Sequence, residues 1–555
     1  MAVEQKRERT WLLVAIGALL AAIGLTFWPV LSGGFIGLDD GNNIFLNPQL
    51  GVLNGSRVAW AFSDLESARR YMPLGWLGFS AVFTCQGLAP LGYHAASLGW
   101  QMVGAVALFL AVRNILRLGE ADDDARWRTW IAALVAAAWA LHPLRTEAVA
   151  WASGMLYTQA GAFVFIALWL WTLRWERPEI SGWLAAVSGL ALAASLLTYP
   201  IALGFPIAAW LLDHSARKFR PSLPQGLLPA KGWWGVALVT GLGLVATLLA
   251  RGKNPENFAA TASLADFGVT ERMTQALYVW GRYLRQLVWP ADLSLVYTDL
   301  YSLHPLGRGV LLTLIGSGIV LASAAVLVWR KRLSPAPWLA YSAMAFPFLG
   351  LTEHPWIAHD RYATLLHPVW LVAAGIWLGR LRNHRARIAL SVLAALVTAG
   401  WAAEARSLTR HWKDHWTMHE HLTQTLPHDP WAGYYLGSIP ASVLFLDGRF
   451  DEIEPQLKRA EAAAPGWSAD PVRAEYRELI RKHEEFLHQN WPGRRLAPLA
   501  VLHFLHGTAA EGRHDWATAR AHFEAAMWAA ADFPEALREM GRCDRELGGR
   551  AGVGR

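Results

Sequence analysis

Long apolar runs dominate residues 1–404 of the chain. A helix needs roughly 20 consecutive apolar residues to cross a bilayer, and about eleven runs approach that length. The pattern therefore predicts an all-α, polytopic bundle of transmembrane helices. The expected spans lie near residues 11–31, 92–116, 129–143, 155–174, 181–198, 199–213, 232–250, 308–330, 336–352, 362–379 and 386–404.

Two further segments are amphipathic rather than continuously apolar. Residues 71–90 begin and end near proline, and residues 270–289 repeat apolar side chains at helical spacing with arginines elsewhere on the circle. Helices of this kind lie in the plane of the membrane interface. We expect the two segments to wall a site at the outer membrane surface.

The pattern changes after Trp401. Residues 405–555 are charged, rich in alanine and broken by glycine and proline. Two stretches, 436–467 and 505–537, share a plan of apolar helix, glycine turn and a second helix that starts with an acid. That plan resembles tetratricopeptide (TPR) repeats of about 34 residues, which stack into a solenoid. The alternative is a generic bundle of α-hairpins. Domains are thus expected at 1–404 and 405–555.

Composition agrees with a membrane protein. Of the 555 residues, 54% are hydrophobic and only 17% are charged, and 31 are tryptophan. A soluble globular enzyme carries roughly 25% charged residues. Two cysteines, Cys85 and Cys543, exclude a disulfide framework and a cysteine zinc site. The net charge of +7 does not require nucleic acid as a partner, because loop arginines account for it.

Basic residues gather in alternate loops, as they do in cytoplasmic loops. With about eleven spans, this bias places the N-terminus in the cytoplasm and the C-terminal domain outside, in the periplasm if the membrane is a bacterial inner membrane. The first span is too long for the apolar region of a signal peptide, roughly 7–15 residues, and is expected to be retained. The basic segments are 6–9, 113–128, 174–178, 214–220, 330–332 and 380–387.

Ionisable residues near hydrocarbon are candidates for function because they are costly there. An acidic pair follows the first span, and two later segments on the expected outer side combine histidine, arginine and acid. A carboxylate can accept a proton from a hydroxyl nucleophile, an arginine fork can bind phosphate, and a histidine can hydrogen-bond it. The candidates are Asp39, Asp40, His142, Arg145, Glu147, Arg282, His354, His359, Asp360 and Arg361.

These residues occur within an ordered set of motifs. The chain carries LDD at 38–40, YMPL at 71–74, APLGYH at 89–94, HPLRTEAVAW at 142–151 and DRY at 360–362. The set resembles the GT-C class of membrane glycosyltransferases, in particular bacterial relatives of the transmembrane-and-TPR O-mannosyltransferases. The resemblance follows almost the whole chain in order.

The resemblance implies a function. The expected activity is transfer of a sugar from a polyprenyl-phosphate donor to a hydroxyl acceptor, presumed to be protein, on the extracytoplasmic side. Asp39 or Asp40 would be the catalytic base, with Asp39 favoured by its match to the motif. His142, Arg145, Glu147, Arg282, His354, Asp360 and Arg361 would bind substrate, and the repeats would bind the acceptor or a partner. No cofactor is expected, and a divalent metal is not favoured in this branch.

The chain also departs from the family pattern. Met155, Leu156 and Tyr157 stand where the family carries Arg-Ala-Asp, and Thr198 and Tyr199 stand where it carries Lys-Glu. Leu38 replaces an aromatic residue before the acids. Either donor recognition has diverged, or the chain is the alternative, a catalytically degenerate scaffold whose repeats bind or brace an assembly. A transporter is a third reading, although no pair of broken helices with a repeated pattern is evident.

Overall fold

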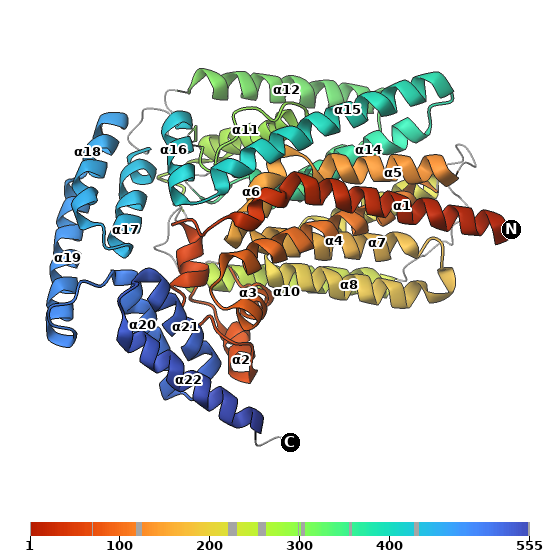
Figure 1. Ribbon diagram of the computed structural model, residues 1–555. Coiled ribbons are helices and arrows are strands. Elements are labelled where there is room, and N and C mark those ends of the chain that lie inside the picture. Colours follow the sequence, from red (N-terminus) through yellow and green to blue (C-terminus); the bar gives the residue numbers. More distant parts are fainter. Residues whose placement is uncertain are drawn as a thin grey trace. The chain divides into compact units, whose positions relative to one another are not determined.

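The chain folds as helices joined by short turns, and the described residues contain no β-strand (Figure 1). The structure is a computed structural model. It describes residues 2–68, 70–117, 125–219, 230–253, 262–297, 299–300, 306–353, 358–426 and 432–552. The prediction of an all-α fold is confirmed.

Two compact units divide the chain. The first unit comprises Met1–Ser32, Ser63–Gly75 and His94–Arg410, and the second comprises Gly33–Phe62, Trp76–Tyr93 and His411–Arg555. The second unit therefore takes in two segments, 33–62 and 76–93, that sequence analysis assigned to the membrane domain. Hydrogen bonds from Gly34 N–H to the Lys413 carbonyl and from Val52 N–H to Thr518 Oγ1 illustrate why these segments belong with the C-terminal residues.

Thirteen helices of the described chain belong mainly to the first unit. Their bounds are α1 (Ala2–Phe27), α4 (Pro90–Leu116), α5 (Ala125–Ala140), α6 (Thr146–Ala150), α7 (Met155–Leu173), α8 (Ser181–Thr198), α9 (Phe205–Phe219), α10 (Ala230–Lys253), α11 (Val269–Val288), α12 (Arg308–Trp329), α13 (Ala336–Ala345), α14 (His367–Gly379) and α15 (His384–Leu408).

Eight helical segments within the described residues are long and apolar enough to cross a membrane, so the chain is compatible with a membrane-embedded protein. Each coincides with an expected span. The three other expected spans correspond to α5, α9 and α13, which have 16, 15 and 10 residues. The eight segments are Arg7–Ser32, Pro90–Leu116, Ala152–Leu173, Pro178–Thr198, Gly235–Lys253, Arg308–Trp329, Asp360–Gly379 and His384–Trp412.

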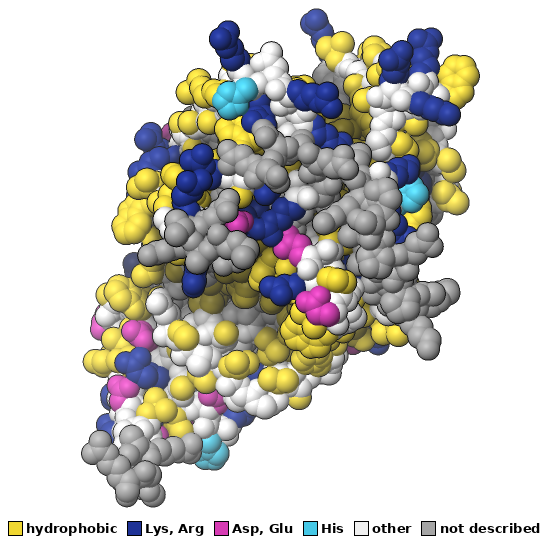
Figure 2. All heavy atoms as spheres, turned by 90° about the vertical axis from the view of Figure 1, so that its right-hand side faces the viewer, with side chains coloured by type: hydrophobic (Ala, Val, Ile, Leu, Met, Phe, Trp, Pro, Cys, Tyr) yellow, Lys and Arg dark blue, Asp and Glu magenta, His cyan; other side chains and the backbone are white. Residues whose placement is uncertain are grey.

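Several segments that the charge pattern groups together meet at one end of the first unit. Arg117 pairs with Glu8 of α1 at 2.9 Å and with Glu176, beyond α7, at 2.6 Å. The ring of Trp127 at the start of α5 lies 6.5 Å from that of His384 at the start of α15. Figure 2 views this end and shows Lys and Arg side chains gathered there. Four of the six basic segments, 6–9, 113–128, 174–178 and 380–387, thus share one end of the helix bundle.

A buried ion pair lies in the same region. Arg174 follows α7 and is fully buried, and its Nη2 lies 3.1 Å from Oδ2 of Asp213 on α9. Oδ1 of Asp213 also accepts hydrogen bonds from the indole N–H groups of Trp171 and Trp175, at 3.2 and 3.1 Å. Because every charge and most lone pairs have partners, the pair can persist inside an apolar bundle.

The second unit is also helical. The turn after α17 needs glycine, since Gly448 has φ of +72° and a Cβ there would meet Ala497 at 3.2 Å. The corresponding turn after α20 uses His514, with φ of +57°, and Asp515 caps α21 by accepting from Thr518 N–H. Its helices are α2 (Gly55–Ser63), α3 (Pro73–Gln86), α16 (His415–Thr425), α17 (Ile439–Leu446), α18 (Ile453–Ala463), α19 (Asp470–Asn490), α20 (Pro498–Gly512), α21 (Trp516–Ala529) and α22 (Pro534–Gly552).

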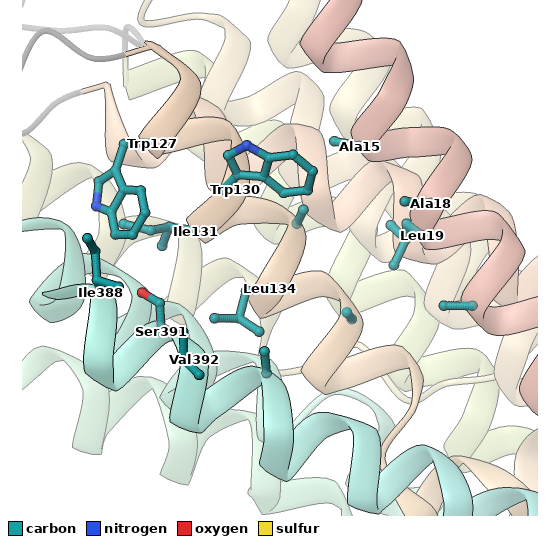
Figure 3. Close-up of a pocket in the computed structure, with 14 residues that line it drawn as sticks. Ala15, Ala18, Leu19, Trp127, Trp130, Ile131, Leu134, Ile388, Ser391 and Val392 are labelled. Atoms are coloured by element: carbon teal, nitrogen blue, oxygen red, sulfur yellow. The ribbon is translucent and has the colours of Figure 1, made fainter.

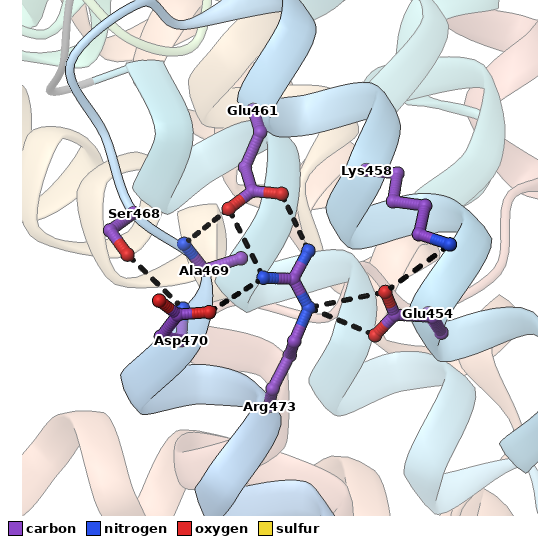
Figure 4. A network of polar contacts seen from close by, with 7 residues as sticks. All are labelled: Glu454, Lys458, Glu461, Ser468, Ala469, Asp470 and Arg473. Carbon is purple, nitrogen blue, oxygen red and sulfur yellow. Dashed lines mark hydrogen bonds and ion pairs between the residues drawn. The ribbon is translucent and has the colours of Figure 1, made fainter.

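An arginine network joins α18 to α19 (Figure 4). Arg473 on α19 reaches Glu454 at 2.9 Å and Glu461 at 2.5 Å, both on α18, and Asp470 at 2.8 Å. Glu461 also accepts the Ala469 N–H at 3.0 Å, at the base of the connecting turn. The network ties α18 to α19, and because its carboxylates are partly or largely exposed, each ion pair stabilises the contact only weakly.

The Arg174–Asp213 pair provides a test of the packing of the first unit. Asp213→Ala leaves the Arg174 guanidinium buried without its carboxylate, and breaking such a pair costs about 3–5 kcal/mol. We expect a clear fall in the thermal unfolding temperature of the detergent-solubilised chain. Glu179→Ala, at an acid that is 60% exposed, is the matched control and should leave it unchanged. Equal melting temperatures for Asp213→Ala and Glu179→Ala would contradict a buried ion pair between Arg174 and Asp213.

Candidate functional site

The site begins where α5 ends. Pro143 opens a 3₁₀ turn, Pro143–Arg145, and the turn leads into the short helix α6. His142 caps the turn, because its Nδ1 accepts the Leu144 N–H at 3.3 Å. Beyond α6 the chain folds back closely: a Cβ on Gly154 would lie 2.6 Å from the Ala148 carbonyl oxygen. This compact fold buries the side chains of residues 142–154 inside the first unit.

Glu147 and Arg361 form the central contact of the site. Both are buried, and the Arg361 guanidinium forms an ion pair with Oε1 of Glu147. The backbone N–H of Arg361 also donates to Oε2 of Glu147 at 2.7 Å. The pair joins α6 to the 3₁₀ turn Asp360–Thr364 that precedes α14. Burial raises the pKa of Glu147, while Arg361 acts in the opposite direction.

Asp360 connects this pair to α11. Its Oδ1 accepts hydrogen bonds from the Tyr297 hydroxyl at 2.8 Å and from Gln286 Nε2 at 3.4 Å. The guanidinium carbon of Arg282 lies 3.7 Å from the centre of the Tyr297 ring, and Arg282 Nη1 lies 3.8 Å from Asp299. The polar face of α11 is therefore turned inward over the site. Arg282, which sequence analysis named as a substrate-binding candidate, lies buried on this face.

Arg145 is the most unusual residue of the site. Its side chain is fully buried, and none of its three guanidinium nitrogens has a hydrogen-bond partner among the described residues. The Trp139 ring lies 6.0 Å away, and Asp360 and Glu147 act on the guanidinium electrostatically. Burial lowers the pKa of Arg145 to about 9, so it stays charged at neutral pH. A buried charge without hydrogen bonds is costly, which marks Arg145 as a ligand-binding candidate.

The histidines of the site are engaged with the backbone. His142 Nε2 lies 3.3 Å from the Leu287 carbonyl oxygen, so with its Nδ1 used in the cap both ring nitrogens are occupied. His359 Nδ1 lies 3.0 Å from the Leu295 carbonyl oxygen. Burial, reinforced by the Arg361 charge, lowers the pKa of His359 well below its usual value. Both histidines therefore hold the chain in place as neutral rings rather than offering a proton to phosphate.

Sequence analysis did not select Arg70 or the tyrosines beside it. The guanidinium of Arg70 lies 5.3 Å from the centre of the Tyr199 ring, and the Tyr199 and Tyr157 rings are 4.7 Å apart. Arg361 in turn lies 5.3 Å from the Tyr157 ring. Tyr157 and Tyr199 are two of the residues that sequence analysis identified as departures from the motifs of the glycosyltransferases that the chain resembles. Here they form an aromatic wall between two arginines, and the one signal in the sequence that could have found Arg70 is its place directly before the YMPL motif.

Two predicted residues lie in the second unit. Asp40 is fully buried, and its Oδ2 accepts the Ile36 N–H at 2.9 Å, so it shapes the loop that follows the first helix. Asp39 is exposed and acts electrostatically on Tyr434. The structure therefore gives the adjacent acids different surroundings. His354 lies outside the described residues.

An apolar groove of about 380 Å³ lies on the first unit between α1, α5 and α15 (Figure 3). Trp127 and Trp130 flank it, and Leu19, Leu134 and Val392 are among its lining residues. Helix α15 continues from the groove toward the site. Ala395, the last lining residue of α15, precedes Trp401 by about 9 Å of helix, and Trp401 lies 4.5 Å from the His142 ring. An apolar chain in the groove would point toward the charged cluster.

The charges of the site favour an anionic ligand. The site contains four arginines and three carboxylates, of which two are buried and one is exposed: Arg70, Arg145, Arg282 and Arg361, with Glu147, Asp360 and the exposed Asp299. Arginine forks suit phosphate because they donate two parallel hydrogen bonds. A phosphodiester, which carries one negative charge, would balance the excess and provide acceptors for Arg145.

A double-mutant cycle tests the central pair. Glu147→Gln leaves Arg361 buried without a counter-charge, and we expect the variant to lose about 3–5 kcal/mol of stability. The double variant Glu147→Gln/Arg361→Met removes both members of the ion pair, so neither charge is left buried alone. Its loss of stability should therefore be smaller than the sum of the two single-variant losses by about 1–3 kcal/mol. Thermal unfolding in detergent measures both quantities. The exposed pair Arg449–Glu452, at 2.7 Å, is the control and should show no coupling energy. If the stability losses of the Glu147 and Arg361 variants simply add, the contact between the two residues is contradicted.

Comparison of the chain with family models, curated proteins and solved structures found no match. The assignment of a function therefore depends on the residues of this chain. Those residues are a buried cluster with excess positive charge and an apolar groove whose helices lead to it. The arrangement can bind a molecule that combines an anionic head with a long apolar tail.

Proposed function

We propose that this chain is an integral-membrane glycosyltransferase of the GT-C class. It transfers a sugar from a polyprenyl-phosphate donor to a hydroxyl acceptor, a protein in our proposal, on the extracytoplasmic side. The polyprenyl chain occupies the groove between α1, α5 and α15, and the phosphate is held by Arg145 and its neighbours. The single observation that carries the proposal is the buried Arg145, whose nitrogens have no hydrogen-bond partner among the described residues.

The reaction requires one proton acceptor and one stabilised leaving group. The acceptor hydroxyl attacks the anomeric carbon, its oxygen forms the new glycosidic bond, and the bond from that carbon to the phosphate oxygen breaks. Asp39, exposed and acidic, takes the hydroxyl proton as general base. The polyprenyl phosphate leaves with an added negative charge, which the arginines stabilise. No metal or cofactor takes part in this scheme.

The finer architecture belongs to the same proposal. Eleven spans are obtained if α5, α9 and α13 cross the membrane together with the eight longer segments. The basic end of the first unit then lies in the cytoplasm, in accord with the positive-inside rule, and the C-terminal domain lies outside, in the periplasm of a bacterial inner membrane. Helices α17–α22 form a short TPR-like solenoid that binds the acceptor or a partner. The Tyr157–Tyr199 wall reflects a donor preference different from that of the family.

Arg145→Met provides a direct test of the phosphate site. Methionine is apolar and close in length, so it removes a buried charge that the described residues leave without hydrogen bonds. We expect the delipidated variant to melt at the same temperature as the parent or higher, because replacing a buried charge by an apolar side chain is often neutral or stabilising. Polyprenyl phosphate co-purified with the variant, quantified by mass spectrometry, should fall by about tenfold or more, corresponding to about 1.4 kcal/mol.

Arg174→Met is the matched control. Arg174 is also buried and charged, but it is paired with Asp213, so its loss should lower the melting temperature while the folded protein still retains lipid. A purely structural role for Arg145 predicts the opposite result for Arg145→Met, namely a lower melting temperature and unchanged lipid. Mass spectrometry of the parent protein also separates polyprenyl phosphate from ordinary phospholipid as the occupant of the groove.

Asp39→Asn tests the catalytic base. Asparagine is nearly isosteric and still forms hydrogen bonds, but it does not accept the proton. We expect the rate of transfer to fall by about 100-fold or more, while the protein stays folded and membrane-inserted. Transfer is measured with the co-purified lipid-linked sugar, after its identification, as labelled donor.

Two further variants separate catalysis from loop structure. Asp451→Asn, at an exposed acid of the second unit, should leave transfer intact. Asp40→Ala removes the acceptor of the Ile36 N–H, so it should act mainly on stability. Full transfer activity in both Asp39→Asn and Asp40→Asn, or no transfer by the parent chain, would favour a scaffold in which the acids have only an architectural role.

A further inference from the structure

Three histidines of the second unit lie together in the helical hairpin that α20 and α21 form. His503 and His506 are separated by one helical turn on α20, and His522 projects from α21. One ring nitrogen of each lies within 4.8 Å of the others. Within the described residues, this is the one group of histidine, cysteine and acidic side chains with such spacing.

The spacing of two of these nitrogens suits a tetrahedral metal ion. Nδ1 of His503 lies 3.4 Å from Nδ1 of His522. Two nitrogens bound to one tetrahedral Zn²⁺, each about 2.0–2.1 Å from the ion, are separated by about 3.3–3.4 Å. The third ring, that of His506, has its centroid 5.3 Å from His522 and 6.5 Å from His503. A small rotation of the His506 side chain would bring its nitrogen into the same coordination sphere.

The hydrogen bonding of the histidine rings also favours a bound metal ion. Nδ1 of His506 is buried and has no hydrogen-bond partner among the described residues. His503 and His522 are 3% and 2% exposed, so water has little access to their rings. A buried polar nitrogen without a partner is unfavourable, and metal coordination would remove that deficit.

The surroundings keep the three rings neutral, which is the form that binds metal. Burial lowers the pKa of His503 to about 3, and His506 adds to the effect. Burial also lowers the pKa of His506 and of His522, and Arg513 contributes to both shifts. Arg57 acts on His522 as well, but it lies 3.6 Å from Asp515, which offsets its charge.

We propose that His503, His506 and His522 bind a first-row divalent transition metal, Zn²⁺ being favoured, with water in the fourth position. Imidazole ligands select Zn²⁺, Cu²⁺, Ni²⁺ or Co²⁺ over Mg²⁺ and Ca²⁺, which prefer oxygen. The ion joins α20 to α21 and so rigidifies the end of the second unit. The site does not depend on the proposed glycosyl transfer.

Co²⁺ titration of the metal-stripped, full-length protein in detergent tests the site, after removal of any histidine tag. Four-coordinate Co²⁺ gives intense visible d–d bands, and we expect one equivalent to produce them and Zn²⁺ to bleach them. His506→Gln, at a half-buried position, should weaken binding by about 100-fold or more, since losing even an outer-sphere partner costs about 10–100-fold. His522→Gln should do the same.

The exposed His488 on α19 provides the matched control, and His488→Gln should bind Co²⁺ as the parent does. Melting of each metal-free variant shows whether it is folded, so that loss of binding is not confused with loss of structure. Zn²⁺ should raise the melting temperature of the parent and of His488→Gln but not of His506→Gln. Absence of Co²⁺ bands in the folded parent, or equal affinity in all the variants, would overturn the proposal.

Discussion

The first unit depends on the neutralisation of charge inside an apolar helix bundle. Glu147 and Arg361 are both buried, and each satisfies the other through the side chain and, for Arg361, through the backbone N–H as well. Because desolvated charges are costly, this contact requires α6 and the turn before α14 to meet in one geometry. The inward polar face of α11 and the hydrogen bonds of Tyr297 and Gln286 to Asp360 extend the same requirement to a third element.

Arg145 does not meet that requirement with protein groups. Glu147, Asp360 and Arg361 each form hydrogen bonds within the cluster, yet none of the three Arg145 guanidinium nitrogens has a hydrogen-bond partner within the described residues. In our proposal a ligand supplies the missing acceptors, because a buried charge without them is costly. We propose an amphiphilic phosphate rather than a free anion, because one molecule then accounts for both Arg145 and the groove along α5 and α15.

The second unit shows a different way of joining helices. Its helices α18 and α19 are linked by Arg473 and three carboxylates, whereas the hairpin α20–α21 brings together three histidines, two of them buried. Exposed ion pairs are solvated and contribute orientation more than stability. Buried imidazoles gain little from water, so a bound metal would contribute much more to the hairpin than the surface network does to α18 and α19.

The sequence by itself determined the helical class, the positions of the long apolar helices and most members of the charged cluster. Apolar runs and charged residues near them are local properties that can be read from the sequence. The motifs HPLRTEAVAW and DRY contain Arg145, Glu147, Asp360 and Arg361, so these residues could be chosen as candidates without knowledge of the packing. Tertiary structure decided which of these residues meet. In the folded chain Arg282 packs against Tyr297, and His142 hydrogen-bonds to the backbone. Tyr157 contacts Tyr199, and residues 33–62 belong to the same unit as the C-terminal helices. Tertiary structure also brought His522 to His503 and His506, because contacts between residues distant in sequence depend on how helices pack, which no local pattern encodes.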